Sequence, residues 1–231
     1  TPVHRMMLFQ DIKAKCVIGF HKWNSINHYS KSMSFENIQQ HVTKAISLVA
    51  HNLGLELKNC RSYDLHIPDA ICFEILEYLA KWEGKVKVII NAFTGSPERN
   101  LSQEQFSQVI AMLNEQSDNL IIIILDHRKE LDVLLPDNVF INPFGSLHHV
   151  MQLIKNVDLV ISPDTSIVHI SAAWKKSLIS VYKNVTDNVY LWAPGYKQAS
   201  QIIVNGRRVS DVENVSEFIL KEIRERGLLE S

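Results

Sequence analysis

Short runs of β-branched residues alternate with longer amphipathic segments from residue 85 onward, and this alternation constrains the fold more than any other feature. The runs are almost wholly apolar, which is typical of strands buried on both faces. They cover residues 86–90, 120–125, 139–141, 159–161, 178–182 and 201–204. Strands that alternate with helices build βαβ units, so the pattern predicts an α/β fold with a six-stranded parallel sheet.

The segments between these runs carry apolar residues at helical spacing. Residues 102–116 begin with Ser102 and Gln105, the spacing of a capping box. The residues that repeat there every three or four positions are Phe106, Val109, Ile110 and Leu113. The same spacing predicts helices over 146–156 and 211–226. In the last helix, the expected buried face consists of Val215, Phe218, Ile219 and Ile223.

The first 66 residues differ from the rest and predict only part of a domain. They indicate a strand over 16–20, a polar loop over 22–34 and a helix over 35–53 that ends at Gly54. Pro68 then precedes a predicted helix over 69–82, after which comes Gly84. We therefore expect a partial N-terminal α/β domain over 1–66 and a complete α/β domain over 67–231.

The charge balance argues against a nucleic-acid partner. Lys and Arg number 24 and Asp and Glu 25, for a net charge of −1, whereas proteins that neutralise phosphate backbones gather positive charge on one face. The longest apolar run, 120–125, is far shorter than the roughly 20 residues that cross a bilayer. Because the first residues also lack a secretory pattern, we expect neither a membrane span nor a signal peptide.

Cysteine and glycine usage exclude several classes of protein. Cys16, Cys60 and Cys72 form no C-x-x-C pair, which argues against a disulfide framework and a zinc site and favours the reducing cytoplasm. We expect no bound metal. The eight glycines form neither G-x-G-x-x-G nor G-x-x-x-x-G-K, and this argues against a dehydrogenase and a P-loop enzyme.

Ligands of open parallel sheets bind beyond the carboxyl ends of the strands, so the loops there are the candidate sites. The first such loop is residues 91–100. Its Thr94, Gly95 and Ser96 offer N–H and hydroxyl groups to an anion, and Arg99 offers a positively charged fork. The alternative is an ordinary turn with a solvated arginine.

The second candidate loop is residues 162–169, before another predicted helix. Asp164, Thr165 and Ser166 precede or open that helix, whose first turn presents free N–H groups and a positive dipole end to a phosphate. His169 follows one turn later on the same helix. The alternative is that Asp164 or Thr165 is only an N-cap and that His169 packs in the interior.

The third candidate loop is aromatic. Tyr182 ends a predicted strand, and residues 192–196 read Trp-Ala-Pro-Gly-Tyr. Aromatic rings beside a Pro-Gly turn are suited to stacking against a sugar or a base. The same rings could instead anchor the loop to the core.

Four motifs occur in an order that resembles glycosyltransferase family 9, the ADP-heptose:lipopolysaccharide heptosyltransferase family. They are Val88-Ile89-Ile90-Asn91 with Gly95-Ser96 and Arg99; residues 156–166, ending in Pro-Asp-Thr-Ser; His169-Ile170-Ser171-Ala172-Ala173; and Trp192-Ala193-Pro194. The resemblance covers roughly residues 65–227. It implies a GT-B-like architecture, in which a Rossmann-like domain over 67–231 holds a sugar nucleotide against an acceptor-side domain over 1–66.

The resemblance also implies roles for single residues. Asp164 would bond the donor sugar, Thr165 and Ser166 would meet the diphosphate, and His169 would lie beside the same pocket. In the first loop, Thr94, Gly95 and Ser96 fall where the family touches phosphate. Arg99 stands where the family has a lysine that neutralises the leaving diphosphate. The acidic ribose contact is left to two alternatives, Asp126 and Glu130.

The activity implied by the resemblance is transfer of heptose or a related sugar. The donor would be a nucleotide sugar similar to ADP-heptose, and the acceptor a lipopolysaccharide or another lipid-linked glycan. Transfer would invert the anomeric carbon and need no metal or cofactor. The family's general base lies in an N-terminal motif without a counterpart in residues 1–66, so no catalytic residue is named.

The implied location is the cytoplasm, with peripheral contact to the inner membrane face. The basic residues that suit such a contact are Arg207, Arg208, Arg224 and Arg226, although most of these charges are also typical of a solvated helix.

Three departures from the family stand out: Ser166 replaces a glycine next to the phosphate, residues 101–102 replace an aromatic-proline pair, and the N-terminal base motif has no counterpart in residues 1–66. The missing base motif and Ser166 motivate a second hypothesis, a non-catalytic module that binds a nucleotide sugar or a glycan. A third hypothesis is a flavodoxin-like or epimerase-like domain whose loops match by chance.

Overall fold

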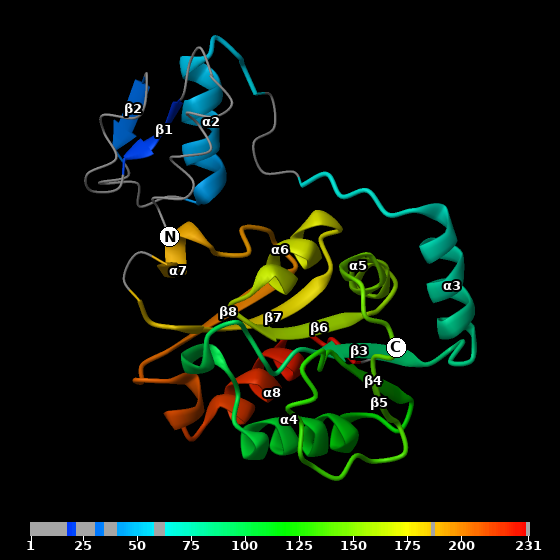
Figure 1. Cartoon of the computed structure of the whole chain (residues 1–231). Helices are drawn as coiled ribbons and strands as arrows, with labels where there is room; N and C mark the ends of the chain where they lie inside the picture. The colour runs from blue at the N-terminus through cyan, green and yellow to red at the C-terminus, as the bar shows by residue number, and fades with distance from the viewer. Residues whose placement is uncertain (1–17, 22–30, 35–40, 58–62, 186–187, 230–231) are drawn as a thin grey trace. The chain divides into compact units, whose positions relative to one another are not determined.

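A computed structural model describes residues 18–21, 31–34, 41–57, 63–185 and 188–229 of the chain (Figure 1). The chain divides into two compact units, Thr1–Arg61 and Ser62–Ser231. Just beyond this division, Leu65 packs against a core cluster of the second unit, and Ile67 is buried.

The first unit contains two short strands and a helix among its described residues. β1 (Ile18–His21) pairs in parallel with β2 (Lys31–Ser34). α2 (Val42–Asn52) is followed by Gly54 at a φ of 77°, the left-handed conformation that ends many helices.

The expected polar loop over 22–34 is therefore wrong at its last four residues. Lys-Ser-Met-Ser has no apolar alternation, and only pairing with β1 makes it a strand. The predictions for 16–17, 22–30 and 35–40 lie outside the described residues.

The second unit is built on a six-stranded parallel sheet, as predicted. Every neighbouring pair of strands in it runs in parallel. The strands are β3 (Val86–Ile90), β4 (Leu120–Ile124), β5 (Val139–Ile141), β6 (Leu159–Pro163), β7 (Ser177–Lys183) and β8 (Ala199–Val204). Their spatial order is β5-β4-β3-β6-β7-β8, so the direction of winding reverses between β3 and β6. Parallel sheets of this order bind ligands at that reversal.

Helices cover both faces of the sheet (Figure 1). On one face lie α4 (Gln103–Gln116) and α8 (Val215–Glu225), and on the other lie α3 (Asp69–Ala80), α5 (Leu147–Lys155) and α6 (Ser166–Ala173). Alternate strand residues enter two separate cores because successive side chains point to opposite faces. Val88 and Ile90 pack with the α4 and α8 side, whereas Ile89 packs with the α3 and α5 side.

The helix ends follow the polar residues predicted from the sequence. Ser102 and Gln105 form both bonds of the capping box of α4. Ser146 caps α5 and accepts a hydrogen bond from the N–H of His149. Each cap satisfies backbone donors that the helix itself leaves unpaired.

Two expectations about burial and extent are wrong. Phe218 was expected on the buried face of the last helix, but it is 42% exposed while Val215, Ile219 and Ile223 are buried. That helix also starts four residues later than predicted, because Val209–Asp211 forms a separate 3-10 turn, η3.

The strands at the two sheet edges, β5 and β8, are only partly buried, since each has a neighbour on one side alone.

No helix within the described ranges is long and apolar enough to cross a membrane.

The central strands should dominate the stability of the second unit. Replacing Ile122, which is fully buried in β4, with alanine should lower the free energy of unfolding by about 2–5 kcal/mol, because a cavity is left behind. Ile203→Ala in edge strand β8, where the side chain is 45% exposed, is the matched control and should cost less than about 1.5 kcal/mol. Urea denaturation followed by circular dichroism measures both, and equal costs would contradict the assignment of the core.

Candidate functional site

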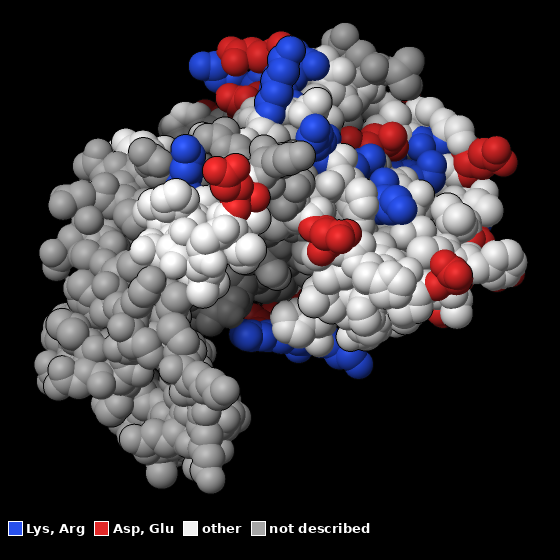
Figure 2. All heavy atoms as spheres, turned by 90° about the horizontal axis from the view of Figure 1, so that it is seen from above, with Lys and Arg blue, Asp and Glu red and all other residues white. Residues whose placement is uncertain are grey.

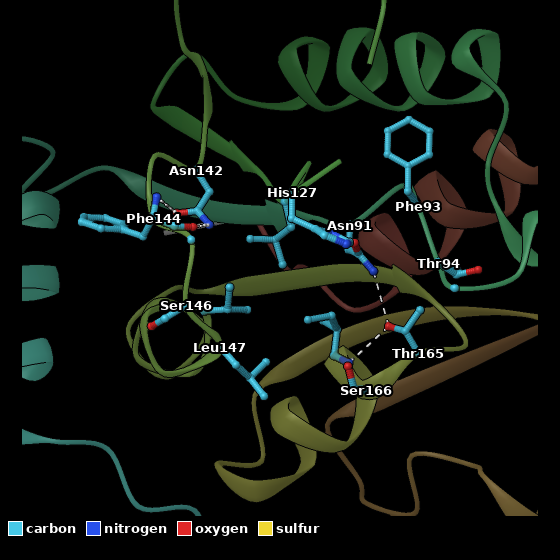
Figure 3. A pocket seen from close by; sticks show the side chains of 15 residues that line it. Asn91, Phe93, Thr94, His127, Asn142, Phe144, Ser146, Leu147, Thr165 and Ser166 are labelled. Carbon is cyan, nitrogen blue, oxygen red and sulfur yellow. Dashed lines mark hydrogen bonds between the residues drawn. The ribbon is translucent and has the colours of Figure 1, made fainter. Parts of the chain in front are cut away.

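A cavity of about 300 Å³ opens at the carboxyl ends of β3 and β4, beside the point where the strand order reverses (Figure 3). Its wall comes from the loops after β3, β4 and β5 and from the first turns of α5 and α6. The lining residues are Asn91, Phe93, Thr94, Gly95, Leu125, His127, Asn142, Phe144, Gly145, Ser146, Leu147, Val150, Thr165, Ser166 and Ile167. Four of the predicted site residues, Thr94, Gly95, Thr165 and Ser166, are among them.

Arg99 and Asp164 join the two predicted loops at the same edge of the sheet. Arg99 Nη1 donates to the carbonyl oxygen of Asp164 at 2.9 Å and lies 3.1 Å from its carboxylate Oδ2. The Asp164 side chain is 11% exposed and that of Arg99 37% exposed. A carboxylate this buried needs a partner, while the outer part of the guanidinium still faces solvent with further N–H groups to donate.

Asn91 connects the end of β3 to the start of α6. Its Nδ2 donates to Ser162 Oγ at 3.2 Å and to Thr165 Oγ1 at 3.4 Å. Thr165 is the N-cap of α6 and accepts from the N–H of Ile167. Figure 3 shows Asn91 and Thr165 pointing toward one another across the cavity wall. This network fixes the first turn of α6, where free N–H groups and the helix dipole favour an anion.

The Thr94 side chain builds its own loop. Its hydroxyl donates to the carbonyl of Ser96 at 2.6 Å and accepts from the N–H of Ser96 at 2.9 Å. The Thr94 N–H donates to Asn100 Oδ1. Gly95 has open space where a Cβ would lie, so this backbone can be approached closely. Thr94 and Gly95 line the cavity, and Ser96 does not.

His169 lies outside the cavity wall, within an aromatic group. Its Nδ1 lies 3.3 Å from the Tyr63 hydroxyl, and its ring packs edge-on against Trp192 at a centroid distance of 5.7 Å. The aromatic residues of the predicted third loop have two different roles in the structure. Tyr182 and Tyr196 donate their hydroxyls to the carbonyls of Trp192 and Lys176 and so anchor the loop, whereas the Trp192 residue is 37% exposed.

Burial raises the pKa of Tyr182 well above its usual range, and the nearby Asp164 carboxylate adds to this rise. The Tyr182 hydroxyl is therefore protonated and acts as a hydrogen-bond donor at all ordinary pH values.

Neither of the two acidic alternatives for a ribose contact lines the cavity. Asp126 accepts through Oδ1 from the N–H of Glu130 and through Oδ2 from the N–H of Leu131. The Glu130 carboxylate lies 3.4 Å from Arg128 at the surface. Between them in sequence, His127 does line the cavity.

The cavity residues not singled out from the sequence include His127, Asn142 and Phe144, whereas Asn91 begins the first candidate loop and Ser146 begins a predicted helix. Asn142 follows β5 directly, so its position after a predicted strand could have found it. Phe144 had no such signal: it is placed by the Asn142 side chain, which bonds both its N–H and its carbonyl. In the described parts of the chain, no group of three or more potential metal ligands occurs.

The strand order and this edge site define a Rossmann-like α/β domain with a site suited to an anionic ligand. The sequence model of glycosyltransferase family 9 (heptosyltransferase) matches residues 6–218. The chain therefore belongs to glycosyltransferase family 9.

One curated relative is the putative lipopolysaccharide heptosyltransferase 4 of Escherichia coli K12. It is 27% identical over 217 residues, which cover 90% of this chain and 58% of the relative. The chain thus spans less than two thirds of the length of that protein.

Solved structures of glycosyltransferases share the fold. E. coli ADP-heptose LPS heptosyltransferase II has a TM-score of 0.74 at 12% identity, over 98% of this chain and 73% of that one. A family 9 glycosyltransferase from Veillonella parvula has a TM-score of 0.73 at 14% identity, over 98% and 71%. E. coli heptosyltransferase WaaC, solved with ADP, has a TM-score of 0.59 at 21% identity, over 86% and 60%. These likenesses confirm the predicted GT-B-like α/β fold class.

The Thr165 hydroxyl should be a structural requirement of the site. Thr165→Val keeps the shape of the side chain but removes the acceptor for Ile167 N–H and Asn91 Nδ2, and it should lower the free energy of unfolding by about 1–2 kcal/mol. Ser166→Ala, one residue later and exposed, is the control and should change it by at most about 0.5 kcal/mol. Urea unfolding tests this, and an unchanged midpoint for Thr165→Val would show that the cap is dispensable.

Proposed function

We propose that this chain is a glycosyltransferase that moves heptose or a related sugar from a nucleotide-sugar donor similar to ADP-heptose to a lipopolysaccharide or another lipid-linked glycan. The observation that carries the proposal is the Arg99–Asp164 pair at the start of α6, directly beside the cavity. A cation, a helix N-terminus and a cavity in one place match the parts of a sugar nucleotide.

The cavity suits the nucleoside of the donor. Its volume of about 300 Å³ is at the lower end of the range for small-molecule sites. Apolar residues such as Leu125, Leu147 and Val150 line it together with the amide-bearing residues Asn91 and Asn142. A base would stack on the apolar walls and find hydrogen-bond partners among the amides. The relative WaaC was solved with ADP, which supports an adenine nucleotide.

The diphosphate would lie at the first turn of α6, beside Arg99. When the bond between the sugar and the diphosphate breaks, negative charge grows on the leaving group. The free N–H groups of α6 and the outward N–H groups of Arg99 are already oriented there, so they stabilise the charge without rearrangement. Asp164 holds Arg99 in place, and its carboxylate would also bond a hydroxyl of the donor sugar.

In this arrangement the protein's own cation and dipoles stabilise the leaving group, and we propose transfer without a divalent metal. The acceptor hydroxyl would attack from the face opposite the diphosphate, which inverts the anomeric carbon. A general base of the acceptor-side domain would remove its proton. We place the reaction in the cytoplasm, at the inner face of the membrane that carries the lipid-linked acceptor.

The direct test incubates the purified chain with ADP-heptose and deacylated E. coli lipopolysaccharide, with and without EDTA, and follows sugar transfer by mass spectrometry. Transfer that persists in EDTA supports the proposal. Tight ADP binding without transfer would instead support the non-catalytic binding module, which Ser166 in the cavity wall at the start of α6 also favours. Absence of both ADP binding and transfer would sink the proposal.

Arg99 should carry a large share of nucleotide affinity. Arg99→Gln should weaken ADP binding about tenfold, because a charge-assisted contact to the diphosphate is lost. Arg224→Gln is the control, since Arg224 of α8 donates to Gln116 of α4 and does not line the cavity. Isothermal titration with ADP measures both variants, and equal affinities would remove Arg99 from the donor site.

Ser166 should limit the approach of phosphate to α6. Ser166→Gly removes the side chain at the first residue of the helix and should strengthen ADP binding severalfold, at a cost of up to about 1 kcal/mol in stability. Ser166→Ala removes the hydroxyl but keeps the Cβ and is the matched comparison. If titration shows no gain for glycine over alanine, the backbone of this turn does not contact the diphosphate.

A further inference from the structure

The four arginines near the C-terminus fall into two groups at opposite edges of the sheet. Arg226 donates to the carbonyls of Leu178 and Gln198 at the amino ends of β7 and β8, and Arg224 donates to Gln116. Arg207 and Arg208 follow the carboxyl end of β8, are exposed, and have no ion-pair partner among the described residues. Only these two lie at the edge that carries the candidate site.

Arg207 and Arg208 belong to a rigid segment, residues 205–208, which we call the arginine turn. A Cβ on Gly206 would lie 2.8 Å from the carbonyl oxygen of Arg208 and 2.9 Å from Val212 Cγ2, so only glycine fits this turn. The Arg208 N–H donates to Asp211 Oδ2 at 3.1 Å. The backbone that presents both guanidinium groups is therefore fixed before any ligand binds.

Gln105 of α4 holds the next residues of the same segment. It is 5% exposed, and its Nε2 donates to the carbonyls of Val209 at 3.1 Å and Val212 at 2.7 Å. The arginine turn is thus anchored to the helix that follows the Arg99 loop. Ordered backbone on this scale reduces the entropy lost when a ligand is bound.

The charges around the arginine turn are largely paired with one another. Lys183 at the end of β7 bonds Glu98 at 3.0 Å. The hydrogen bond and charge of Lys183, and then the charges of Arg208 and Arg207, lower the pKa of Glu98, which places both arginines near the 3-10 turn Pro97–Arg99, η2. Glu98 is matched by Lys183 and Asp164 by Arg99. Arg207 and Arg208 add two positive charges at the turn itself, while the acidic residues Glu104, Asp211 and Glu213 line a hollow beside it.

Elsewhere the charges are mixed. Figure 2 shows acidic and basic side chains interspersed over the described part of the face in view, without a broad field of one sign. A neighbouring pair of unpaired guanidinium groups is therefore a local feature and not part of a general basic surface.

The order of groups along the carboxyl edge separates this turn from the donor cavity. The cavity lies at β3, β4 and β5, the Arg99–Asp164 pair at β3 and β6, and the arginine turn after β8. β8 is two strands from β6, about 10 Å at the usual spacing between strands. If the nucleoside occupies the cavity and the diphosphate the start of α6, the donor sugar extends toward β7 and β8. The acceptor would then approach from that side.

We propose that the arginine turn binds a phosphate or carboxylate group of the acceptor glycan and so selects an anionic acceptor. Two adjacent guanidinium groups on fixed backbone match the paired oxygens of such groups, and each can donate two parallel hydrogen bonds. The inference rests on the proposed function, because it takes the direction of the donor from it.

The test measures binding of deacylated E. coli lipopolysaccharide to the full chain by isothermal titration. Three forms of this oligosaccharide are compared: native, enzymatically dephosphorylated, and dephosphorylated with its carboxyl groups reduced. Arg207→Gln/Arg208→Gln should weaken binding of the native form about tenfold. Binding of the neutral form and of ADP should stay unchanged. The dephosphorylated form shows whether phosphate or carboxylate is recognised.

Two further variants separate loss of charge from loss of structure. Gly206→Ala keeps both arginines but forces the turn to move. It should weaken binding of the native oligosaccharide severalfold and have little effect on binding of the neutral form. Lys155→Gln/Lys221→Gln removes the same charge from two exposed lysines on α5 and α8 and should leave all affinities unchanged. Circular dichroism confirms that each variant is folded.

Several outcomes would overturn the inference. The double arginine variant could bind the native oligosaccharide as tightly as the parent chain does. Its affinity for the neutral form could also fall as much as its affinity for the native form. It could lose ADP affinity in parallel, which would assign the arginines to the donor. Arginine-dependent binding to phosphatidylglycerol vesicles without oligosaccharide binding would assign them to a membrane surface. If the chain fails to bind ADP but binds the native oligosaccharide through the two arginines, the proposed donor site is refuted and the anionic-glycan site is supported.

Discussion

The pairing of β3 with β6 is the contact on which the rest of the second unit depends. Val88, Ile89 and Ile90 lie opposite Leu159, Val160 and Ile161, and the N–H of Asn91 extends the ladder to the carbonyl of Ile161. The chain winds outward from β3 through β4 to β5 and returns to place β6 on the other side. The loops after β3 and β6 therefore leave in different directions, and a crevice opens between them.

The polar contacts at that crevice make the two loops one unit. Asn91 reaches from the β3 loop to Thr165, and Arg99 reaches from the same loop to Asp164. Asp164 is buried, and its carboxylate and its carbonyl oxygen both accept from Arg99 and so hold the guanidinium in place. An anion that binds the outer N–H groups of Arg99 meets a side chain already held in place, so little entropy is lost on binding.

Polar side chains after the strands divide into those that build the loops and those that face the cavity. Asp126 and the Thr94 hydroxyl satisfy backbone groups of their own loops, and Gln105 satisfies the carbonyls of a distant one. Residue type does not separate the two roles, because aspartate and threonine are equally good partners for backbone and for ligand. The roles become clear only when each hydrogen bond is assigned.

The sequence by itself determined the six parallel strands, the helices between them and the two loops that carry the site. Local signals sufficed for this: apolar runs, capping residues such as Ser102 and Ser146, and the Asp164-Thr165 pair before a helix. The strand β2 was not predictable from its own residues, because it forms by pairing with β1. The exposure of Phe218 was not predictable from helical spacing, which places it beside the buried Val215 and Ile219. Only the tertiary structure decided that Arg99 pairs with Asp164, that Asn142 and Phe144 complete the cavity, and that Arg207 and Arg208 share its edge. Such contacts join segments tens of residues apart. The order of the strands decides which loops meet, and this order is fixed by packing of the whole sheet and not by any local pattern.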